Sequence, residues 1–173
     1  MSPNDRPSLQ QAHNLFSVRT GPLDVFVRPQ SVAIIGATEQ QHSVGRALVA
    51  NLLGSGPPGK VFLVNTRHST VLGHRCYPRV GDVPESIDLA VIAVPASSVP
   101  EVIRQCIAAK VRGAIVISAG FKEIGARGIS LENEIRDMIA GQSIRVIGPN
   151  CIGVMSPVFK LNATFAASMA QPG

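Results

Sequence analysis

Aromatic residues and charges are scarce in this chain of 173 residues. It has no tryptophan, one tyrosine and six phenylalanines, and charged residues make up 16% of it, against about 25% in an average domain. So few aromatic rings argue against a sugar-binding platform or a single-stranded nucleic-acid surface built on stacked rings. The low charge, together with 45% hydrophobic residues, predicts a folded chain with much buried strand.

Cysteines are few, and long apolar runs are missing. Cys76, Cys106 and Cys151 stand at no metal-ligand spacing, so neither a disulfide framework nor a metal site is indicated. No apolar run approaches the ~18 residues that cross a bilayer, and the first residues lack the basic-then-apolar pattern of a secretory signal. We therefore expect a soluble, cytoplasmic protein with no membrane partner.

The formal net charge of +5 is unevenly distributed. Residues 1–80 carry eight Lys or Arg against three Asp or Glu, whereas residues 81–173 carry eight of each sign. An excess of this size suits one phosphorylated small ligand better than duplex nucleic acid, which usually calls for a denser basic face.

The order of apolar segments predicts the fold class. Residues 1–22 are polar and lack a sustained period, so we expect an N-terminal extension followed by one domain over 23–173. Within that domain lie five short, β-branched runs, at 32–35, 61–64, 89–94, 114–117 and 144–147. Strands that are apolar on both faces are typical of a parallel sheet covered on each side. The prediction is an α/β, Rossmann-type doubly wound fold, with a mainly parallel five-stranded sheet and helices on both faces.

Three helices are expected between these strands. Ser43 is the expected N-cap of the first, Ser98 with Glu101 reads as a capping box for the second, and Ser130 is expected to open the third. The crossover over 66–87 shows no helical stripe, so we expect only a short strand or a single helical turn there.

A glycine-containing loop follows the first predicted strand. Gly36 permits a tight turn, and Gly45 lets backbone or ligand approach the first turn of the following helix, whose free N–H groups favour a phosphate. The spacing is longer than G-x-G-x-x-G, so the dinucleotide fingerprint is only partly met. We expect Gly45→Val to weaken ligand binding more than the fold.

The end of the second predicted strand carries an arginine in place of an acidic residue. NAD-binding domains usually hold the ribose 2′-hydroxyl with Asp or Glu at this point, whereas this chain has Asn65, Thr66 and Arg67. An anion-binding arginine suits a ligand with a phosphate on its ribose, which means NADP or coenzyme A.

Three further loops follow the ends of predicted strands, and we expect them to lie near the ligand crevice at the carboxyl edge of the sheet. Cys151 has no His or Asp in a triad-like context, so we interpret it as a small buried thiol and predict no catalytic residue. Asn150 offers an amide that can donate and accept at once. The residues of these loops are Val94, Pro95 and Ala96, then Ser118, Ala119 and Gly120, then Asn150 and Cys151.

Five blocks, in the same order along the chain, resemble those of one family. They are residues 31–38, 88–95, 117–123, 147–153 and 161–165. Together they are similar to the CoA-binding domain of the NDP-forming (ADP-forming) acyl-CoA synthetases, which are related to the succinyl-CoA synthetase alpha subunit. The family usually has a proline where this chain has Thr66.

The resemblance implies a role for each candidate residue. The loop from Gly36 to Gly45 and the first helix would hold the pyrophosphate of CoA, Asn65 to Arg67 would flank the ribose phosphate, and the other loops would line the pantetheine channel as far as Asn150 and Cys151. The residues of the pyrophosphate site would be Gly36, Ala37, Thr38, Ser43, Val44 and Gly45.

The resemblance also implies partners. The full-length enzyme would join an acid to CoA with ATP, through a phosphorylated histidine, and this chain would be a fragment of it that makes no acyl-CoA alone. ATP or ADP with magnesium would bind in ATP-grasp and phosphohistidine domains of the same or a partner chain. Two alternatives are a CoA-sensing module of a protein lysine acetyltransferase, which would add an acetyltransferase domain, and an NADP-binding oxidoreductase domain.

Overall fold

The computed structural model describes residues 21–57 and 59–171. The predicted N-terminal extension therefore lies outside the described residues, apart from its last two. The first described helix is α2 (Asp24–Val27), and its Val25 and Phe26 are buried in the core.

The five predicted strands are β2, β1, β5, β6 and β7, which form a contiguous run ending at one edge of a seven-stranded sheet. The strand order is β3-β4-β2-β1-β5-β6-β7, and every neighbouring pair is parallel except β3 with β4. The central strands β1 and β5 are buried along their whole length, as expected for strands covered on both faces. The strands are β1 (Ser31–Ile35), β2 (Lys60–Val64), β3 (Thr70–Val71), β4 (His74–Tyr77), β5 (Leu89–Ile92), β6 (Gly113–Val116) and β7 (Arg145–Ile147).

The crossover over 66–87 is the reason the sheet has more than five strands. It contains the short strands β3 and β4 and the 3₁₀ turn η1 (Val80–Asp82) in place of a long helix. Strand β4 pairs with β2 only through Cys76 and Tyr77. The sheet is therefore extended at this edge by a very short stretch of pairing. Such a segment is too short to show a period in sequence.

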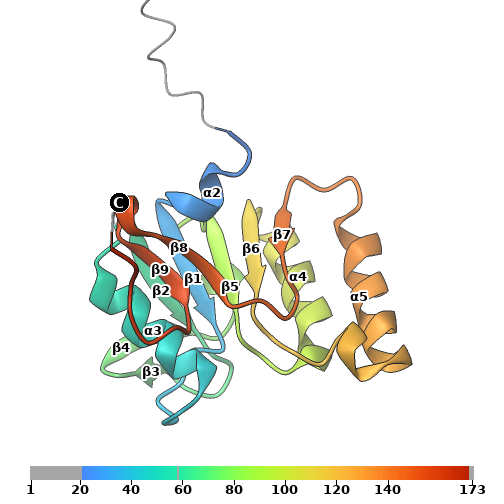
Figure 1. The fold of residues 1–173 in the computed structure, drawn as a ribbon, viewed down its shortest axis with the longest axis horizontal. Coiled ribbons are helices and arrows are strands. Elements are labelled where there is room, and N and C mark those ends of the chain that lie inside the picture. The colour runs from blue at the N-terminus through green and yellow to red at the C-terminus, as the bar shows by residue number, and fades with distance from the viewer. Residues whose placement is uncertain (1–20, 58, 172–173) are drawn as a thin grey trace, which may run out of the picture.

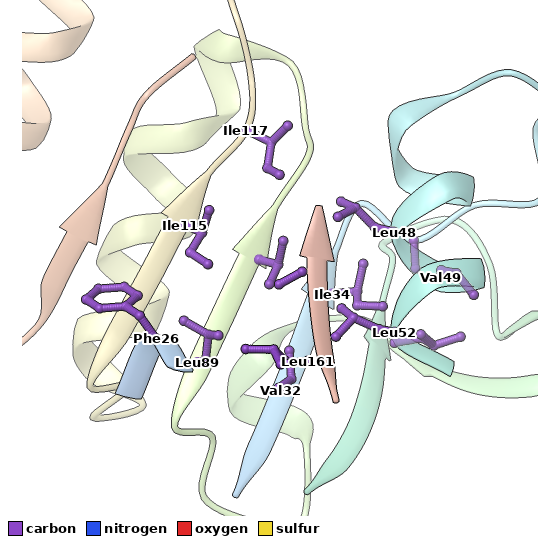
Figure 2. Packing of buried hydrophobic residues seen from close by; sticks show 14 of the residues in the cluster. Phe26, Val32, Ile34, Leu48, Val49, Leu52, Leu89, Ile115, Ile117 and Leu161 are labelled. Carbon is purple, nitrogen blue, oxygen red and sulfur yellow. The ribbon is translucent and has the colours of Figure 1, made fainter. Parts of the chain in front are cut away.

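Helices cover both faces of the sheet, as predicted (Figure 1). One face is covered by α2, by α3 (Val44–Ser55) and by a separate hairpin of β8 (Gly153–Ser156) and β9 (Leu161–Thr164). The other is covered by α4 (Val99–Ala108) and α5 (Ala126–Ile139). Figure 2 shows the first core, where Leu48, Val49 and Leu52 of α3 pack towards Ile34 of β1 and Leu161 of β9.

The start of α3 is confirmed as predicted. The Ser43 hydroxyl accepts a hydrogen bond from the backbone N–H of Arg46. The helix ends at Gly56, whose positive φ of 60° closes it in the left-handed region, as is common at helix C-termini.

The starts of the other two helices differ from prediction. Ser98 is already helical, being the last residue of the 3₁₀ turn η2 (Ala96–Ser98), so its side chain makes no cap, and Glu101 bonds Arg104 and Gln105 instead. Helix α5 begins four residues before Ser130, at Ala126. A 3₁₀ turn, η3 (Lys122–Ile124), precedes this start and packs against α5.

The hairpin of β8 and β9 was not expected from the sequence. In β9, Leu161 and Ala163 pack in the first core. The alternating polar residues Asn162 and Thr164 are buried as well. The turn between the strands is η4 (Pro157–Phe159). The carboxamide of Asn51 on α3 donates to the carbonyl oxygens of Thr164 (2.8 Å) and Ala166 (2.9 Å), and it thereby ties the end of the hairpin to the helix.

Candidate functional site

A cavity of about 410 Å³ lies where β5, β6 and β7 end. Parallel strands all place their carboxyl ends at one edge of the sheet, and α3 begins at that same edge. The wall is mainly apolar, with Ser118 and Asn150 as its polar side chains. The lining residues are Val44, Ala93, Val94, Ile117, Ser118, Ala119, Asn150, Cys151, Ile152 and Phe165.

The loop after β1 is pinned to β2. The backbone N–H groups of Gly36 and Ala37 both donate to the carbonyl oxygen of Val64, at 3.0 and 3.3 Å. Gly36 has a φ of 96°, which only glycine adopts readily.

Of the two approaches expected at Gly45, of backbone or of ligand, the structure shows that of backbone. Its Cα lies so close to the Gly36 carbonyl oxygen that an added Cβ would overlap that oxygen and stand 3.1 Å from Thr38 Cγ2. Gly45 is buried and serves the approach of loop backbone to helix. The expectation that Gly45→Val would damage ligand binding more than the fold is therefore wrong, since the side chain would first collide with the backbone.

A second, adjoining cavity of about 310 Å³ lies beside the first turn of α3. It shares Val44 and Phe165 with the cavity at the strand ends and adds the cationic or ionisable side chains of His42 and Arg46. The Arg46 guanidinium donates to the Glu39 carbonyl oxygen at 3.0 Å. This end of the site can therefore offer positive charge as well as the free N–H groups of a helix start to an anion.

The turn after β2 is organised by Asn65. The Asn65 carboxamide oxygen accepts from the backbone N–H of Arg67 (2.7 Å) and of His68 (3.2 Å), and its nitrogen donates to the Ala37 carbonyl oxygen (2.7 Å). Arg67 is exposed, and among the described residues it forms no ion pair.

The loops after β6 and β7 are joined to each other. The Asn150 backbone N–H donates to the Ser118 carbonyl oxygen at 3.0 Å, and Asn150 itself has a left-handed φ of 56°. Ser118 is buried, and its hydroxyl oxygen finds no hydrogen-bond partner in the described part of the chain. The two polar side chains of the cavity, Ser118 and Asn150, therefore come from loops that are hydrogen-bonded to each other.

Cys151 lies in the wall as a half-buried thiol. Its Sγ donates to the Val116 carbonyl oxygen at 3.3 Å, and burial raises the pKa of the thiol. Because the thiolate is the reactive form, this environment does not activate Cys151 as a nucleophile.

The structure gathers some of the sequence-predicted residues in the cavity and leaves others around it. Six of them line it: Val44, Val94, Ser118, Ala119, Asn150 and Cys151. Ser43 borders the adjoining cavity. The remaining ones line neither of these two cavities: Gly36, Ala37, Thr38, Gly45, Asn65, Arg67, Pro95, Ala96 and Gly120. Four lining residues were missed, namely Ala93, Ile117, Ile152 and Phe165. The block at 161–165 contained a signal for Phe165, but only the hairpin brings that residue to the cavity.

Another cavity, of about 400 Å³, lies between η1 and the end of α4, with Arg79, Gln105 and Ala109 in its wall. It also contacts Ile87, which precedes β5, so it opens near the amino end of that strand. Of the described residues, no three His, Cys, Asp or Glu side chains are grouped so that they could hold a metal ion. A helix long and apolar enough to span a membrane is likewise absent from residues 21–57 and 59–171.

The strand order and the cavity together define the class of protein. Leaving out β3, the sheet has the 3-2-1-4-5-6 order of a Rossmann fold, with its switch point between β1 and β5, and ligands of such folds bind outside the carboxyl ends of the strands. Comparison with known proteins then identifies the family. The model of the CoA binding domain matches residues 30–157, and the chain belongs to this family of CoA-binding domains.

Curated relatives agree with this family. The chain is 45% identical over 145 residues to an ADP-forming acetate–CoA ligase of Methanocaldococcus jannaschii, which covers 84% of this chain and 20% of that protein. It is 39% identical over 150 residues to an ADP-forming 4-hydroxybutyrate–CoA ligase of Nitrosopumilus maritimus, over 86% of this chain and 21% of the ligase. The chain thus spans about a fifth of the length of these relatives.

Solved structures show the same similarity. A crystal structure of a Pyrococcus horikoshii protein superposes with a TM-score of 0.83 at 38% identity, over 87% of this chain and 34% of that one. An acetyl-coenzyme A synthetase of Ca. Korarchaeum cryptofilum, in complex with phosphate and ADP, superposes with a TM-score of 0.76 at 40% identity, over 83% of this chain and 30% of the other.

Proposed function

We propose that this chain is the CoA-binding domain of an ADP-forming acyl-CoA synthetase. In the full-length protein, acid, CoA and ATP would give acyl-CoA, ADP and phosphate. The observation that carries the proposal is the family match over residues 30–157, which includes the β1–α3 loop and every strand that ends at the cavity. The relatives named as ADP-forming ligases support the reaction type.

CoA would lie across the carboxyl edge of the sheet. The loop from Gly36 to Gly45 and the start of α3 would take the pyrophosphate, supported by the helix N–H groups and the nearby Arg46. Arg67 would contact the 3′-phosphate of the adenosine ribose. The pantetheine arm would then enter the mainly apolar cavity, with its thiol towards Asn150 and Cys151.

The remaining chemistry would belong to other domains. Two of the relatives, both from Pyrococcus furiosus, are named as alpha subunits of ADP-forming acetate–CoA ligases, which supports ATP-grasp and phosphohistidine domains in the same or a partner chain. Magnesium and ATP or ADP would bind there. The relatives offer no support for an acetyltransferase domain or an NADP-dependent oxidoreductase. Free thiols at all three cysteines support a reducing, cytoplasmic compartment.

The first test is binding without turnover. Calorimetry should show that the chain alone binds CoA, because binding needs only the carboxyl edge of the sheet. The same chain should form no thioester from acetate, ATP and CoA, because no phosphoryl carrier is proposed within it. ATP-dependent thioester formation, or a phosphohistidine on the chain, would contradict this.

The second test compares ligands. The parent should bind CoA more tightly than dephospho-CoA, and both more tightly than NADP. Arg67→Ala should weaken CoA binding about five- to thirtyfold, the value of a charge-assisted contact at a partly exposed site, and leave dephospho-CoA almost unchanged. All titrations need one salt concentration, since such a contact is screened. Tighter binding of NADP than of CoA would overturn the proposed function.

A further inference from the structure

The Asn65 carboxamide joins two segments that are far apart in sequence. Through its oxygen it holds the turn that carries Arg67, with N–H donors at 2.7 and 3.2 Å, and through its nitrogen it holds Ala37 of the loop after β1 at 2.7 Å. Ala37 is thereby bonded on both sides, because its own N–H donates to Val64. The side chain acts as a cross-link between the two loops.

These bonds leave Asn65 little capacity to bind a ligand directly. Both lone-pair directions of the carboxamide oxygen are used by the Arg67 and His68 N–H groups, and one of its two N–H donors is used by Ala37. We expect Asn65 to flank the ribose phosphate, and one N–H of its carboxamide remains for a direct contact there. Its bonds suit a role in positioning its neighbours.

A second contact fixes the same loop from its other end. The Glu39 carboxylate accepts from the backbone N–H of Leu72 at 2.5 Å, in the turn between β3 and β4, where Leu72 has a left-handed φ of 49°. The Glu39 charge is thus held on the β3–β4 turn. The β1–α3 loop and the segment after β2 form one frame with two cross-links.

CoA imposes a fixed distance on the two anionic sites of this frame. Its pyrophosphate and its 3′-phosphate are carried by the same ribose, so a protein that grips both must hold its two binding segments at a matching separation. Holding the segments in place before binding reduces the ordering cost of binding. The Asn65 bonds are the direct side-chain link between the segment that would face the pyrophosphate and the segment that would face the 3′-phosphate.

We propose that Asn65 is a positioning residue for recognition of the adenosine 3′-phosphate. Its carboxamide keeps the Arg67 turn in register with the loop after β1, and by doing so it carries the preference of the protein for CoA over dephospho-CoA. This inference rests on the proposed function, in which Arg67 contacts that phosphate.

The test is a double-mutant cycle on ligand preference. The affinity ratio of CoA to dephospho-CoA is measured by calorimetry for the parent, Asn65→Ala, Arg67→Ala and the double variant. Asn65→Ala should reduce the ratio about five- to thirtyfold, as Arg67→Ala does. The double variant should show no further reduction, because residues that act through one contact are not additive.

Two more variants control for loss of structure. Asn133→Ala removes an asparagine that accepts a hydrogen bond from Arg136 at 2.9 Å on the exposed side of α5, and it should leave the ratio unchanged. Asn65→Ser keeps a side-chain oxygen that can accept from the Arg67 N–H but is too short to reach Ala37, and it should retain part of the preference. It also provides a folded variant should Asn65→Ala fail to fold.

The outcomes separate the inference from the proposed function. Equal weakening of both ligands by Asn65→Ala would mean a merely structural role and overturn the inference, as would an unchanged ratio. A parent without preference would overturn both the inference and the Arg67 contact, while leaving CoA binding intact. Failure of the parent to bind CoA at all would overturn the proposed function itself.

Discussion

Glycine at position 45 is required by the backbone opposite it. The Gly36 carbonyl oxygen occupies the place of a Cβ at this residue, whereas Gly54, two turns or more along the same helix, faces open space. The two glycines of this helix therefore differ in what a side chain at their position would meet.

We predict opposite effects of alanine at these two positions. Gly45→Ala should lower the free energy of unfolding by about 1–3 kcal/mol, because overpacking against backbone outweighs the gain in helix propensity. Gly54→Ala should raise it by up to about 1 kcal/mol, since only the propensity term acts. Urea denaturation of both variants measures the difference, and stabilisation by both would contradict the close approach at Gly45.

Two buried serines differ in the bonds that they make. The Ser31 hydroxyl donates to the Ser86 carbonyl oxygen (2.7 Å) and accepts from the Asp88 N–H (2.8 Å). The Ser118 hydroxyl has no such partner among residues 21–57 and 59–171. A buried hydroxyl without a partner costs free energy, whereas removal of a bonded one leaves other groups unpaired.

Alanine should therefore separate these serines as well. Ser31→Ala is expected to destabilise the protein by about 1–3 kcal/mol, because it leaves a carbonyl and an N–H unsatisfied. Ser118→Ala is expected to leave the melting temperature of the free protein unchanged or higher. Calorimetric melting of the two variants decides, and equal losses would show that Ser118 is bonded in the free protein.

At the scale of elements, the hairpin of β8 and β9 depends on α3. The carboxamide nitrogen of Asn51 donates one hydrogen bond to Thr164, the last residue of β9, and one to Ala166 just after it. These bonds flank Phe165, which lines both cavities of the site. The wall that Phe165 forms is thus held in place by contacts between α3 and a hairpin about a hundred residues further along the chain.

Removing this contact should loosen the hairpin more than the sheet. Asn51→Ala should cost about 1–3 kcal/mol, because two partly buried carbonyl oxygens lose their donor. Asn51→Asp should cost more, since a carboxylate would face those oxygens without a proton to donate. Hydrogen exchange at residues 161–164, compared with the central strands, measures the effect, and uniform exchange changes would argue against a local role.

For the whole molecule, burial of thiols links stability to pH. Cys106 is fully buried in the second core, and burial raises its pKa from 9.0 to about 12. The pKa of Cys76 is also raised, first by burial and then by the charge of Glu39. The unfolded chain therefore loses these protons at lower pH than the folded chain does.

The free energy of unfolding should consequently fall as the pH rises from about 9 to about 12. Below the ordinary thiol pKa the contribution of Cys106 is complete, because both states are protonated, and it is lost as pH approaches the folded value. Cys106→Ala should lower stability at neutral pH by leaving a cavity but should also make the decline above pH 9 shallower. Urea denaturation from pH 8 to 10.5 tests this, and an equal slope in the variant would contradict it.

Much of the architecture could be predicted from the sequence because its signals are local. Runs such as 32–35 and 89–94 are apolar on both faces, and that property alone indicates a covered parallel sheet. Ser43 could be identified as a helix cap since a cap depends on residues within one turn. At Ser98 the prediction of a capping box was wrong, because this residue belongs to a 3₁₀ turn that runs directly into α4.

The five main strands and three helices, the edge of the sheet at which the loops meet, and the family could all be predicted from residues close together in the chain. Three contacts could not be predicted in this way: Gly45 faces the carbonyl of Gly36, Asn65 links two loops, and the hairpin brings Phe165 to the cavity. The physical reason is the range of the interactions. Periodicity and capping act over a few residues, whereas these contacts exist only after the sheet has closed the distance between segments far apart in the chain.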